Sequence, residues 1–314
     1  MAVVAFVFPG QGSQAVGMGH ELALGSAAAA AVFATADDAL GEPISALAWD
    51  GPEDALNRTE NAQPALLAAS IAYLTALRER LASDGAAVAP RFMAGHSMGQ
   101  YSALVAAGAV SLADGVRLVR ERGLRMQSSG SGRDGAMAAV IGLEEAALPA
   151  LIEGASAHGT FGVANRNAPG QVVVSGERAA IEAGADLART LGAKRVIVLP
   201  VSVAAHSPLM AEAAAGMRDV LASVAFQDPA VPLIANGDGH VIDTAEGCRT
   251  ELVEHLTTGV DWIRAVEGMT SAGVDTFVEV GPGKVLTNLI KRIAPESTAF
   301  SLDAPGAFDR LAAS

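Results

Sequence analysis

The pentapeptide Gly95-His96-Ser97-Met98-Gly99 constrains the fold of this chain more than any other segment. An apolar run at 91–95 precedes it and a helical pattern at 97–109 follows it, which predicts a serine on a strand-to-helix turn. Glycines on both sides relieve crowding at such a turn, and a helix N-terminus directs amide hydrogens toward the serine. We therefore predict that Ser97 is a nucleophile in an α/β fold. The alternative is a structural serine in an ordinary turn.

Strand and helix signals alternate along most of the chain. The patterns predict further apolar strands at 2–8, 231–235 and 276–280, and helices at 62–81, 112–127 and 283–293. The helix at 62–81 is apolar on nearly all sides in its first half, which predicts a central, buried position. We expect these elements to form one large main unit.

A second unit is predicted in the middle of the chain. The segment 128–135, SSGSGRDG, is small, polar and rich in glycine, as expected of a boundary. Strand and helix patterns then follow in the order βαββαβ, at 136–141, 144–153, 161–165, 171–175, 177–191 and 195–201. This is the order of a ferredoxin-like module. We interpret it as an inserted subdomain at 131–201, within a main domain formed by 1–130 and 202–314.

Composition and charge exclude several classes of protein. With 51% hydrophobic and 18% charged residues, the chain is not intrinsically disordered. A net charge of −13 argues against nucleic acid as a partner, and no apolar run reaches the roughly 18 to 20 residues of a membrane span. The start of the chain turns at Pro9-Gly10 and resembles a strand more than a signal peptide. The single cysteine, Cys248, excludes a disulfide framework and a cysteine-based zinc site. We expect a cytoplasmic protein without membrane contact, metal or cofactor.

A serine nucleophile needs a base, and histidine is the usual one. His206 follows a strand-like run and lies where the inserted module meets the main unit. His255 lies in a helical stretch, so the residues favour His206 but leave His255 open as a buried or supporting group. The remaining histidines are interpreted as a pocket-shaping residue, His96, and as surface residues, His20, His158 and His240.

Two further features suit acyl chemistry. An oxyanion hole needs two amide hydrogens, which we predict from Met98 and from Gln11 in the Gly10-Gln11-Gly12 turn. This turn could also be an ordinary strand end or a phosphate loop, but GQGSQ lacks the spacing of nucleotide-binding loops. Arg122 follows an apolar helical run, where most arginines are solvated. If it reaches the pocket, it would pair with a substrate carboxylate.

Eight segments together resemble one known family. They are FPGQGSQ (8–14), TENAQPALLAAS (59–70), GHSMGQYSALVAAG (95–108), RGLRMQ (122–127), GAMAAVIGL (135–143), NRNAPGQVVVSG (165–176), HSPLM (206–210) and VEVGPGKVLTNLIKRI (278–293). In this order they resemble the malonyl-CoA:acyl carrier protein transacylases, loading enzymes of bacterial fatty-acid synthesis within the acyltransferase family. The resemblance covers residue 2 to about 300. It implies an α/β-hydrolase-like main domain interrupted by a ferredoxin-like subdomain.

The resemblance also implies roles for the candidate residues. Ser97 would carry the acyl group and His206 would be its base. The amides of Gln11 and Met98 would form the oxyanion hole, and Arg122 would bind the malonyl carboxylate. A main-chain carbonyl near His255, where glutamine is common in the family, would orient the base.

This chain departs from the family pattern at several positions besides His255. Met98 and Gln100 replace the commoner leucine and glutamate. Ala204 and Ala205 precede the base where some relatives carry phenylalanine or serine, and small residues there could admit a substituted malonyl unit.

The implied partners are malonyl-CoA and a holo acyl carrier protein, and a monomer is the expected state. Carrier proteins are acidic, so an acidic enzyme would dock one through a local basic patch. The candidates for this patch, which could also be solvated helix ends, are Arg189, Lys194, Arg195, Lys284, Lys291 and Arg292.

Three other functions stay open at this point. One is a trans-acting polyketide acyltransferase for malonyl or substituted malonyl groups. Another is a serine hydrolase, either esterase or thioesterase, which would share Ser97 and His206 and would need an acidic residue between them in chain order. The third is a carrier-protein binding module without catalysis.

Overall fold

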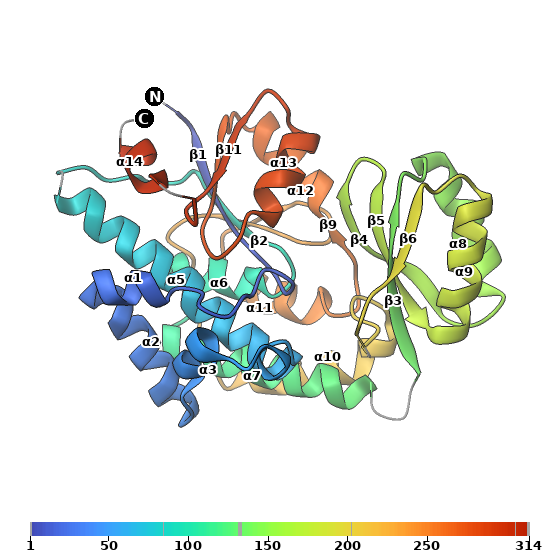
Figure 1. Ribbon diagram of the computed structural model, residues 1–314, viewed down its shortest axis with the longest axis horizontal. Helices are drawn as coiled ribbons and strands as arrows, with labels where there is room; N and C mark the ends of the chain where they lie inside the picture. The colour runs from blue at the N-terminus through green and yellow to red at the C-terminus, as the bar shows by residue number, and fades with distance from the viewer. Residues whose placement is uncertain (1, 84, 131–133, 202, 305, 313–314) are drawn as a thin grey trace.

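The computed structural model describes residues 2–83, 85–130, 134–201, 203–304 and 306–312. Within these ranges the chain forms a mixed α/β molecule with two sheets, which lie side by side in Figure 1. The first sheet has the strand order β11-β10-β1-β2-β7-β8. Its strands are β1 (Val4–Phe8), β2 (Phe92–Gly95), β7 (Leu233–Ile234), β8 (Val241–Ile242), β10 (Thr276–Glu279) and β11 (Thr298–Ser301).

The pairing of β1 with β2 determines where the two glycine-rich turns meet. The two strands are parallel, and Phe8 at the end of β1 is in register with Gly95 at the end of β2. Both strands are buried along their whole length, as expected of parallel strands covered on both faces. The turns that follow, 9–12 and 96–98, therefore lie at the same edge of the sheet.

Side chains of β1 alternate between two hydrophobic cores. Phe6 and Phe8 join a large core with the helices drawn below the sheet in Figure 1, whereas Ala5 and Val7 face α12 and α13. This alternation follows from the period of two along a strand. The helices associated with this sheet are α1 (His20–Gly25), α2 (Ala27–Leu40), α3 (Ile44–Asp50), α4 (Glu53–Leu56), α5 (Thr59–Ser83), α6 (Gly99–Ala106), α7 (Leu112–Gly130), α10 (Ala211–Ala222), α11 (Ala245–Glu254), α12 (Trp262–Ser271), α13 (Val285–Ile293), α14 (Ala307–Ala312) and the short 3₁₀ turn η2 (Pro208–Met210).

Helix α5 is the central helix that the sequence predicts at 62–81. It begins at Thr59, three residues earlier, and ends at Ser83. Its alanines and leucines are buried on nearly all sides, and it packs against α2 and α7. Small side chains allow these helices to approach closely, so a core poor in aromatic residues is still dense.

The second sheet has the order β6-β3-β5-β4-β9 and carries its own small core. Four of its strands come from the predicted βαββαβ segment, and these pair antiparallel. The elements are β3 (Gly135–Ile141), η1 (Glu145–Ala147), α8 (Leu148–Ser156), β4 (Phe161–Ala168), β5 (Gln171–Glu177), α9 (Arg178–Thr190) and β6 (Arg195–Val198). The fifth strand, β9 (Val260–Asp261), comes from much later in the chain and runs parallel to β4, so it ties this sheet to the main unit.

Several local expectations were wrong in their limits. The segment 128–135, predicted as a boundary, overlaps two regular elements: α7 continues through 128–130 and β3 begins at 135, while residues 131–133 lie outside the described residues. The predicted strand at 231–235 is only two residues long, and its partner β8 was not predicted. Tertiary contacts fix such short elements, and periodicity along the sequence does not show them.

Candidate active site

Ser97 lies on the turn between β2 and α6, with a backbone φ of 53°. Both flanking glycines are required by close backbone contacts. A Cβ on Gly95 would lie 1.9 Å from the carbonyl carbon of Gly99, and a Cβ on Gly99 would lie 2.2 Å from the oxygen of Phe8. The strand, the turn and the helix are therefore packed too closely for any other residue at these two positions.

Two buried amide side chains, Gln100 and Asn236, hold this turn through hydrogen bonds. Gln100 accepts a hydrogen bond from the Gly95 amide at 2.9 Å and donates one to the Ile234 carbonyl at 3.0 Å. A carboxylate could accept the first bond but could not donate the second, so the glutamine suits this site. Asn236, two residues after the end of β7, accepts a hydrogen bond from the Ser97 amide through Oδ1 at 2.8 Å.

His206 is the histidine that contacts the serine. Its Nε2 lies 2.8 Å from Ser97 Oγ, and its Nδ1 lies 2.6 Å and 3.1 Å from the carbonyl oxygens of His255 and Thr258. Carbonyl oxygens only accept, so Nδ1 carries the proton and Nε2 is free to accept the serine proton. Burial lowers the pKa of His206 to about 3, and the neighbouring His255 and Arg122 act in the same direction. The imidazole is therefore neutral at neutral pH, as a general base must be.

Arg122 enters the site from α7 and is 1% exposed. Its Nη1 donates to Gln63 Oε1 at 2.8 Å and its Nη2 donates to Ser97 Oγ at 3.0 Å. The guanidinium lies 5.8 Å from the centre of the Tyr101 ring, and burial lowers its pKa. Among the described residues no carboxylate forms an ion pair with it. A buried cation of this kind can bind a carboxylate that enters with a substrate.

The two predicted oxyanion donors come from adjacent turns. A Cβ on Gly10 would lie 2.5 Å from the His96 carbonyl oxygen, so the turn that carries Gln11 rests against the serine turn. Within the described part of the chain, the amides of Gln11 and Met98 donate to no protein acceptor. The Gln11 side chain points elsewhere, to Thr59 Oγ1 at 3.2 Å.

His255 caps the C-terminus of α11 and is 1% exposed. Its carbonyl orients His206, while both of its ring nitrogens lack a hydrogen-bond partner. Its ring centre lies 6.1 Å from that of His206, and burial lowers its pKa. One turn earlier on the helix, Glu251 accepts hydrogen bonds from Asn236.

Of the other four histidines, His96 lies beside Ser97, and within the described part of the chain the remaining three form no hydrogen bond with a residue of the site. His96 contacts Asn167 Oδ1 at 2.8 Å and is tilted against Trp262, so β4 of the second sheet helps to form the wall beside Ser97. His20 stacks on Trp49, and His158 and His240 are exposed.

Sequence reasoning missed three residues of this site, namely Gln63, Asn236 and Glu251. Asn236 could have been noticed, because it is a polar residue directly after the apolar run predicted as a strand at 231–235, and such positions often face a site in parallel sheets. Gln63 and Glu251 give no local signal, because each is a polar residue on an otherwise ordinary helix.

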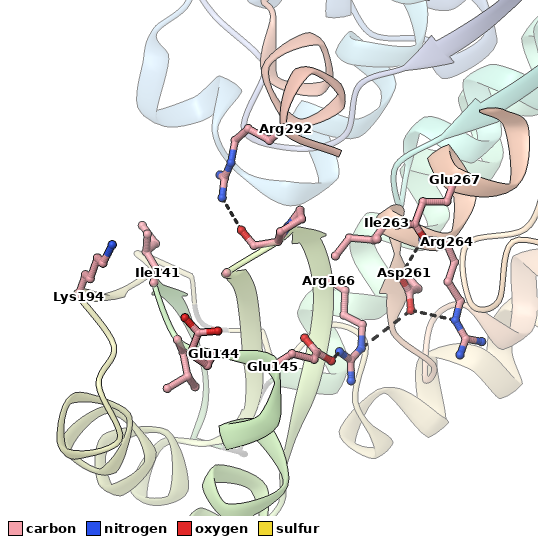
Figure 2. Close-up of a pocket in the computed structure, with 14 residues that line it drawn as sticks. Ile141, Glu144, Glu145, Arg166, Lys194, Asp261, Ile263, Arg264, Glu267 and Arg292 are labelled. Atoms are coloured by element: carbon pink, nitrogen blue, oxygen red, sulfur yellow. Dashed lines mark hydrogen bonds and ion pairs between the residues drawn. The ribbon is translucent and has the colours of Figure 1, made fainter. Parts of the chain in front are cut away.

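A cleft of about 870 Å³ lies between the second sheet and α12 and α13 (Figure 2). Lys194 and Arg292 line it from different elements, and Arg292 donates to the Pro169 carbonyl at 2.6 Å. On another wall Asp261 lies between Arg166 and Arg264. Ser97 is not among the residues that line this cleft.

Other kinds of site have no support in the described residues. The described residues contain no group of three or more histidine, cysteine, aspartate or glutamate side chains that could hold a metal ion. The helices described there include none that is both long and apolar enough to cross a membrane.

The sequence is similar to known transferases along nearly its whole length. The family model for the acyl transferase domain matches residues 5–301. The malonyl CoA-acyl carrier protein transacylase of Escherichia coli strain K12 is 44% identical over 307 residues, covering 98% of this chain and 98% of the relative.

Solved structures agree with this similarity. An acyl-carrier-protein S-malonyltransferase from Bartonella henselae superposes with a TM-score of 0.94 at 41% identity, covering 99% of both chains. A malonyl-transacylase solved in complex with its type II polyketide synthase acyl carrier protein superposes with a TM-score of 0.92 at 40% identity, covering 98% of this chain and 97% of the other.

Proposed function

The chain belongs to the acyl transferase domain family, and on that premise we propose that it transfers malonyl groups from malonyl-CoA to an acyl carrier protein in fatty-acid biosynthesis. The acceptor would be the phosphopantetheine thiol of the carrier. The observation that carries the proposal is the environment of Ser97 Oγ, which lies 2.8 Å from a neutral base, His206, and 3.0 Å from a buried cation, Arg122.

The reaction would proceed in two balanced halves. Ser97 Oγ attacks the thioester carbonyl while His206 Nε2 takes the hydroxyl proton. The Oγ–C bond forms, the C–S bond breaks, and the proton passes from His206 to the departing coenzyme A sulfur. In the second half His206 takes the proton of the carrier thiol, whose sulfur attacks the acyl-serine. The Oγ–C bond then breaks and the proton returns to Ser97.

The oxyanion would be held by the amides of Met98 and Gln11. Both amides lack an acceptor in the described part of the protein, and their turns lie at the same edge of the sheet. Donors that are fixed before the reaction stabilise developing charge without reorganisation.

Arg122 would bind the far carboxylate of the malonyl group. Its guanidinium is buried, and no carboxylate among the described residues forms an ion pair with it. The carboxylate of a bound malonyl group would therefore supply the counter-charge. Fixing that end of the acyl group would also orient the ester carbonyl for attack by the thiol. The transfer itself needs neither a metal nor a cofactor.

We also propose the finer domain description that the sequence suggests. An α/β-hydrolase-like main domain at 1–130 and 202–314 is supported by the parallel pairs of the first sheet and by the serine turn. A ferredoxin-like subdomain at 131–201 is supported by the element order and by the strand order β6-β3-β5-β4. A monomeric, cytoplasmic enzyme is the accompanying expectation.

The carrier protein would dock near the two basic clusters. Lys194 and Arg292 line one cleft although they are far apart in sequence, and this supports a single patch that also includes Arg189, Arg195, Lys284 and Lys291. Arg189 already pairs with Asp186, and Arg292 donates to Gln171 and Pro169. The three lysines and Arg195 form no ion pair within the described residues, so they are the stronger candidates.

A trans-acting polyketide acyltransferase is the second candidate function. It is favoured by the similar malonyl-transacylase that was solved with a type II polyketide synthase carrier protein. The chemistry at Ser97 would be the same. The two small residues beside the base, buried Ala204 and half-buried Ala205, leave a substituted malonyl group open as a substrate.

Intact-protein mass measurement tests the proposal. After incubation with malonyl-CoA we expect a mass gain of one malonyl group on Ser97, which is lost when holo carrier protein is added. Ser97→Ala is the control and should gain no mass. Rapid release of free malonate without any carrier protein would instead identify a hydrolase, and a stable complex with carrier protein without acylation would identify a binding module.

A further inference from the structure

Glu251 is a buried carboxylate for which the reaction above has no use. It lies on α11 and is 7% exposed. Its Oε1 accepts two hydrogen bonds from one residue, from the Asn236 amide at 2.7 Å and from Asn236 Nδ2 at 3.0 Å. Burying a charge with so few hydrogen-bond partners lowers the stability of the fold, which suggests that this carboxylate has another role.

Asn236 connects this carboxylate to the nucleophile. Because Nδ2 donates to Glu251, Oδ1 must point the other way, where it accepts the Ser97 amide at 2.8 Å. The Ser97 backbone has a φ of 53°, which residues other than glycine rarely adopt. This strained turn therefore depends on hydrogen bonds from neighbouring residues. The carboxylate therefore fixes the orientation of the amide that holds the serine.

The same carboxylate lies next to the residue that orients the base. Glu251 Oε1 is 3.8 Å from His255 Nδ1, close but too far for a hydrogen bond. The His255 carbonyl accepts from His206 Nδ1 at 2.6 Å. Burial raises the pKa of Glu251, but the hydrogen bonds that Asn236 donates hold it below its usual value, so the group is ionised at neutral pH.

We propose that Glu251 is a positioning residue of the acyl-transfer site, which acts through Asn236 to hold the backbone of Ser97 in line with His206. It contacts neither substrate nor the reacting atoms. The inference rests on the proposed function only for its choice of substrate, because the geometry concerns the nucleophile alone.

The test compares Glu251→Ala with Glu251→Gln. For Glu251→Ala we expect the rate of Ser97 acylation at saturating malonyl-CoA to fall about tenfold, the order expected when a buried hydrogen-bond partner is removed. The KM for malonyl-CoA should change less than about twofold because Arg122 is untouched. Glu251→Gln should keep the rate within about threefold, since an amide oxygen still accepts both bonds from Asn236. The double variant Glu251→Ala, Asn236→Ala should be no slower than either single variant.

Asp37→Ala is the matched control. Asp37 also accepts two hydrogen bonds from one residue, Ser45, but it joins α2 to the first turn of α3 and not to the serine turn. The Asp37→Ala variant should have a lower Tm than wild type and an unchanged acylation rate. A Glu251→Ala rate equal to wild type, or a loss that Asp37→Ala reproduces, would overturn the proposal. If Glu251→Ala does not fold, Asn236→Ala must show the same slow acylation at unchanged KM.

A second readout separates this inference from the proposed function. The rate at which an organophosphonate probe labels Ser97 reports the alignment of the serine with His206 and does not involve a malonyl group. We expect Glu251→Ala to be labelled about tenfold more slowly than wild type. If the phosphonate labels the wild-type protein but malonyl-CoA does not, the proposed function fails, and the comparison with Glu251→Ala still tests the positioning role. If the phosphonate labels wild type and Glu251→Ala at the same rate, the positioning role is refuted.

Discussion

At the scale of single residues, we expect Arg122 to decide which acyl group the site prefers. Its guanidinium is buried beside Ser97 Oγ with no described carboxylate as partner. A charge-assisted pair with the malonyl carboxylate is worth about 2–3 kcal/mol, so Arg122→Ala should lower kcat/KM for malonyl-CoA about 100-fold more than for acetyl-CoA. Steady-state transfer from the two thioesters to holo carrier protein measures this difference.

The neighbouring arginine on the same helix provides the control. Arg125 forms an ion pair with Glu121 at 2.7 Å, so Arg125→Ala should affect both substrates alike. Equal losses for malonyl-CoA and acetyl-CoA in Arg122→Ala would argue against a carboxylate-binding role and leave the arginine as a support for the serine.

The sequence predicts Ser97, His206 and Arg122, which the structure brings into contact, but not the residues that support them. The motif around Ser97 has a local signature, and His206 follows a strand. For Arg122 the residues left the role open, since a helical pattern does not say what an arginine reaches, and the family resemblance supplied it. Asn236 and Glu251 were not predicted because their hydrogen bonds join positions that only the tertiary fold brings together. No periodicity along the chain reports such contacts.

At the scale of elements, the close packing of β1, the serine turn and α6 predicts a strong effect of a single methyl group. A Cβ on Gly99 would lie 2.2 Å from the Phe8 oxygen, so Gly99→Ala must push β1 and α6 apart. We expect a loss of about 1–3 kcal/mol in the free energy of unfolding, as for other overpacked sites. We also expect slower acylation, because the Met98 amide moves with the helix. Urea unfolding and burst acylation measure the two effects.

Gly268 offers the matched comparison. It is exposed on α12, and its nearest neighbour to a new Cβ is the Gly239 oxygen at an ordinary 3.8 Å. Alanine is favoured over glycine within helices by about 1 kcal/mol, so Gly268→Ala should stabilise the protein slightly and leave acylation unchanged. A Gly99→Ala protein as stable and as active as wild type would show that the three elements can separate freely.

Length alone does not decide which elements were predicted, because α2, α10, α12 and β11 were missed although each is longer than the predicted strand β7. β1, β2, α5 and the βαββαβ series follow from apolar periods and turn residues in the sequence. The two-residue strands β8 and β9 were missed, although β9 pairs with β4 beside the site. A segment as short as Val260–Asp261 has no period of its own, and its pairing with β4 makes it a strand.

At the scale of the whole molecule, charge is distributed unevenly. The net charge is −13, yet all three lysines of the chain lie in the two proposed docking clusters. Because an acidic carrier protein would be repelled by the molecule as a whole, local cations should dominate its binding. The double variant Lys284→Glu, Lys291→Glu should raise KM for holo carrier protein about tenfold while acylation by malonyl-CoA stays unchanged. Steady-state transfer at two salt concentrations measures this.

Arg91→Glu is the control for total charge, and it is compared with the single variant Lys284→Glu because each changes the net charge by about two units. Arg91 is exposed and precedes β2, at the opposite end of that strand from Ser97. If Arg91→Glu raises KM for the carrier as much as Lys284→Glu does, only net charge matters and the proposed patch is wrong.

Burial lowers the pKa of three imidazoles, His96, His206 and His255, which makes the stability of the folded molecule depend on pH; the last two lie side by side in the site. Burial lowers the pKa of His206 to about 3 and lowers that of His255 below the ordinary value of 6.5. As the pH falls below about 6.5, the unfolded chain takes up protons on these histidines that the folded chain does not bind. Their contribution to stability is therefore fully present above pH 6.5 and is lost progressively toward pH 3.

For His206 we expect the free energy of unfolding to fall by up to about 1.4 kcal/mol per pH unit between pH 6 and 4, and the lowered pKa of His255 makes the slope steeper below pH 6.5. Urea unfolding at several pH values measures the slope. His255→Gln should reduce the slope by the share of one histidine, since glutamine does not titrate, whereas exposed His158→Gln should leave it unchanged. If His255→Gln keeps the wild-type slope, the His255 imidazole takes up its proton equally in the folded and unfolded chain, and its burial does not govern its protonation.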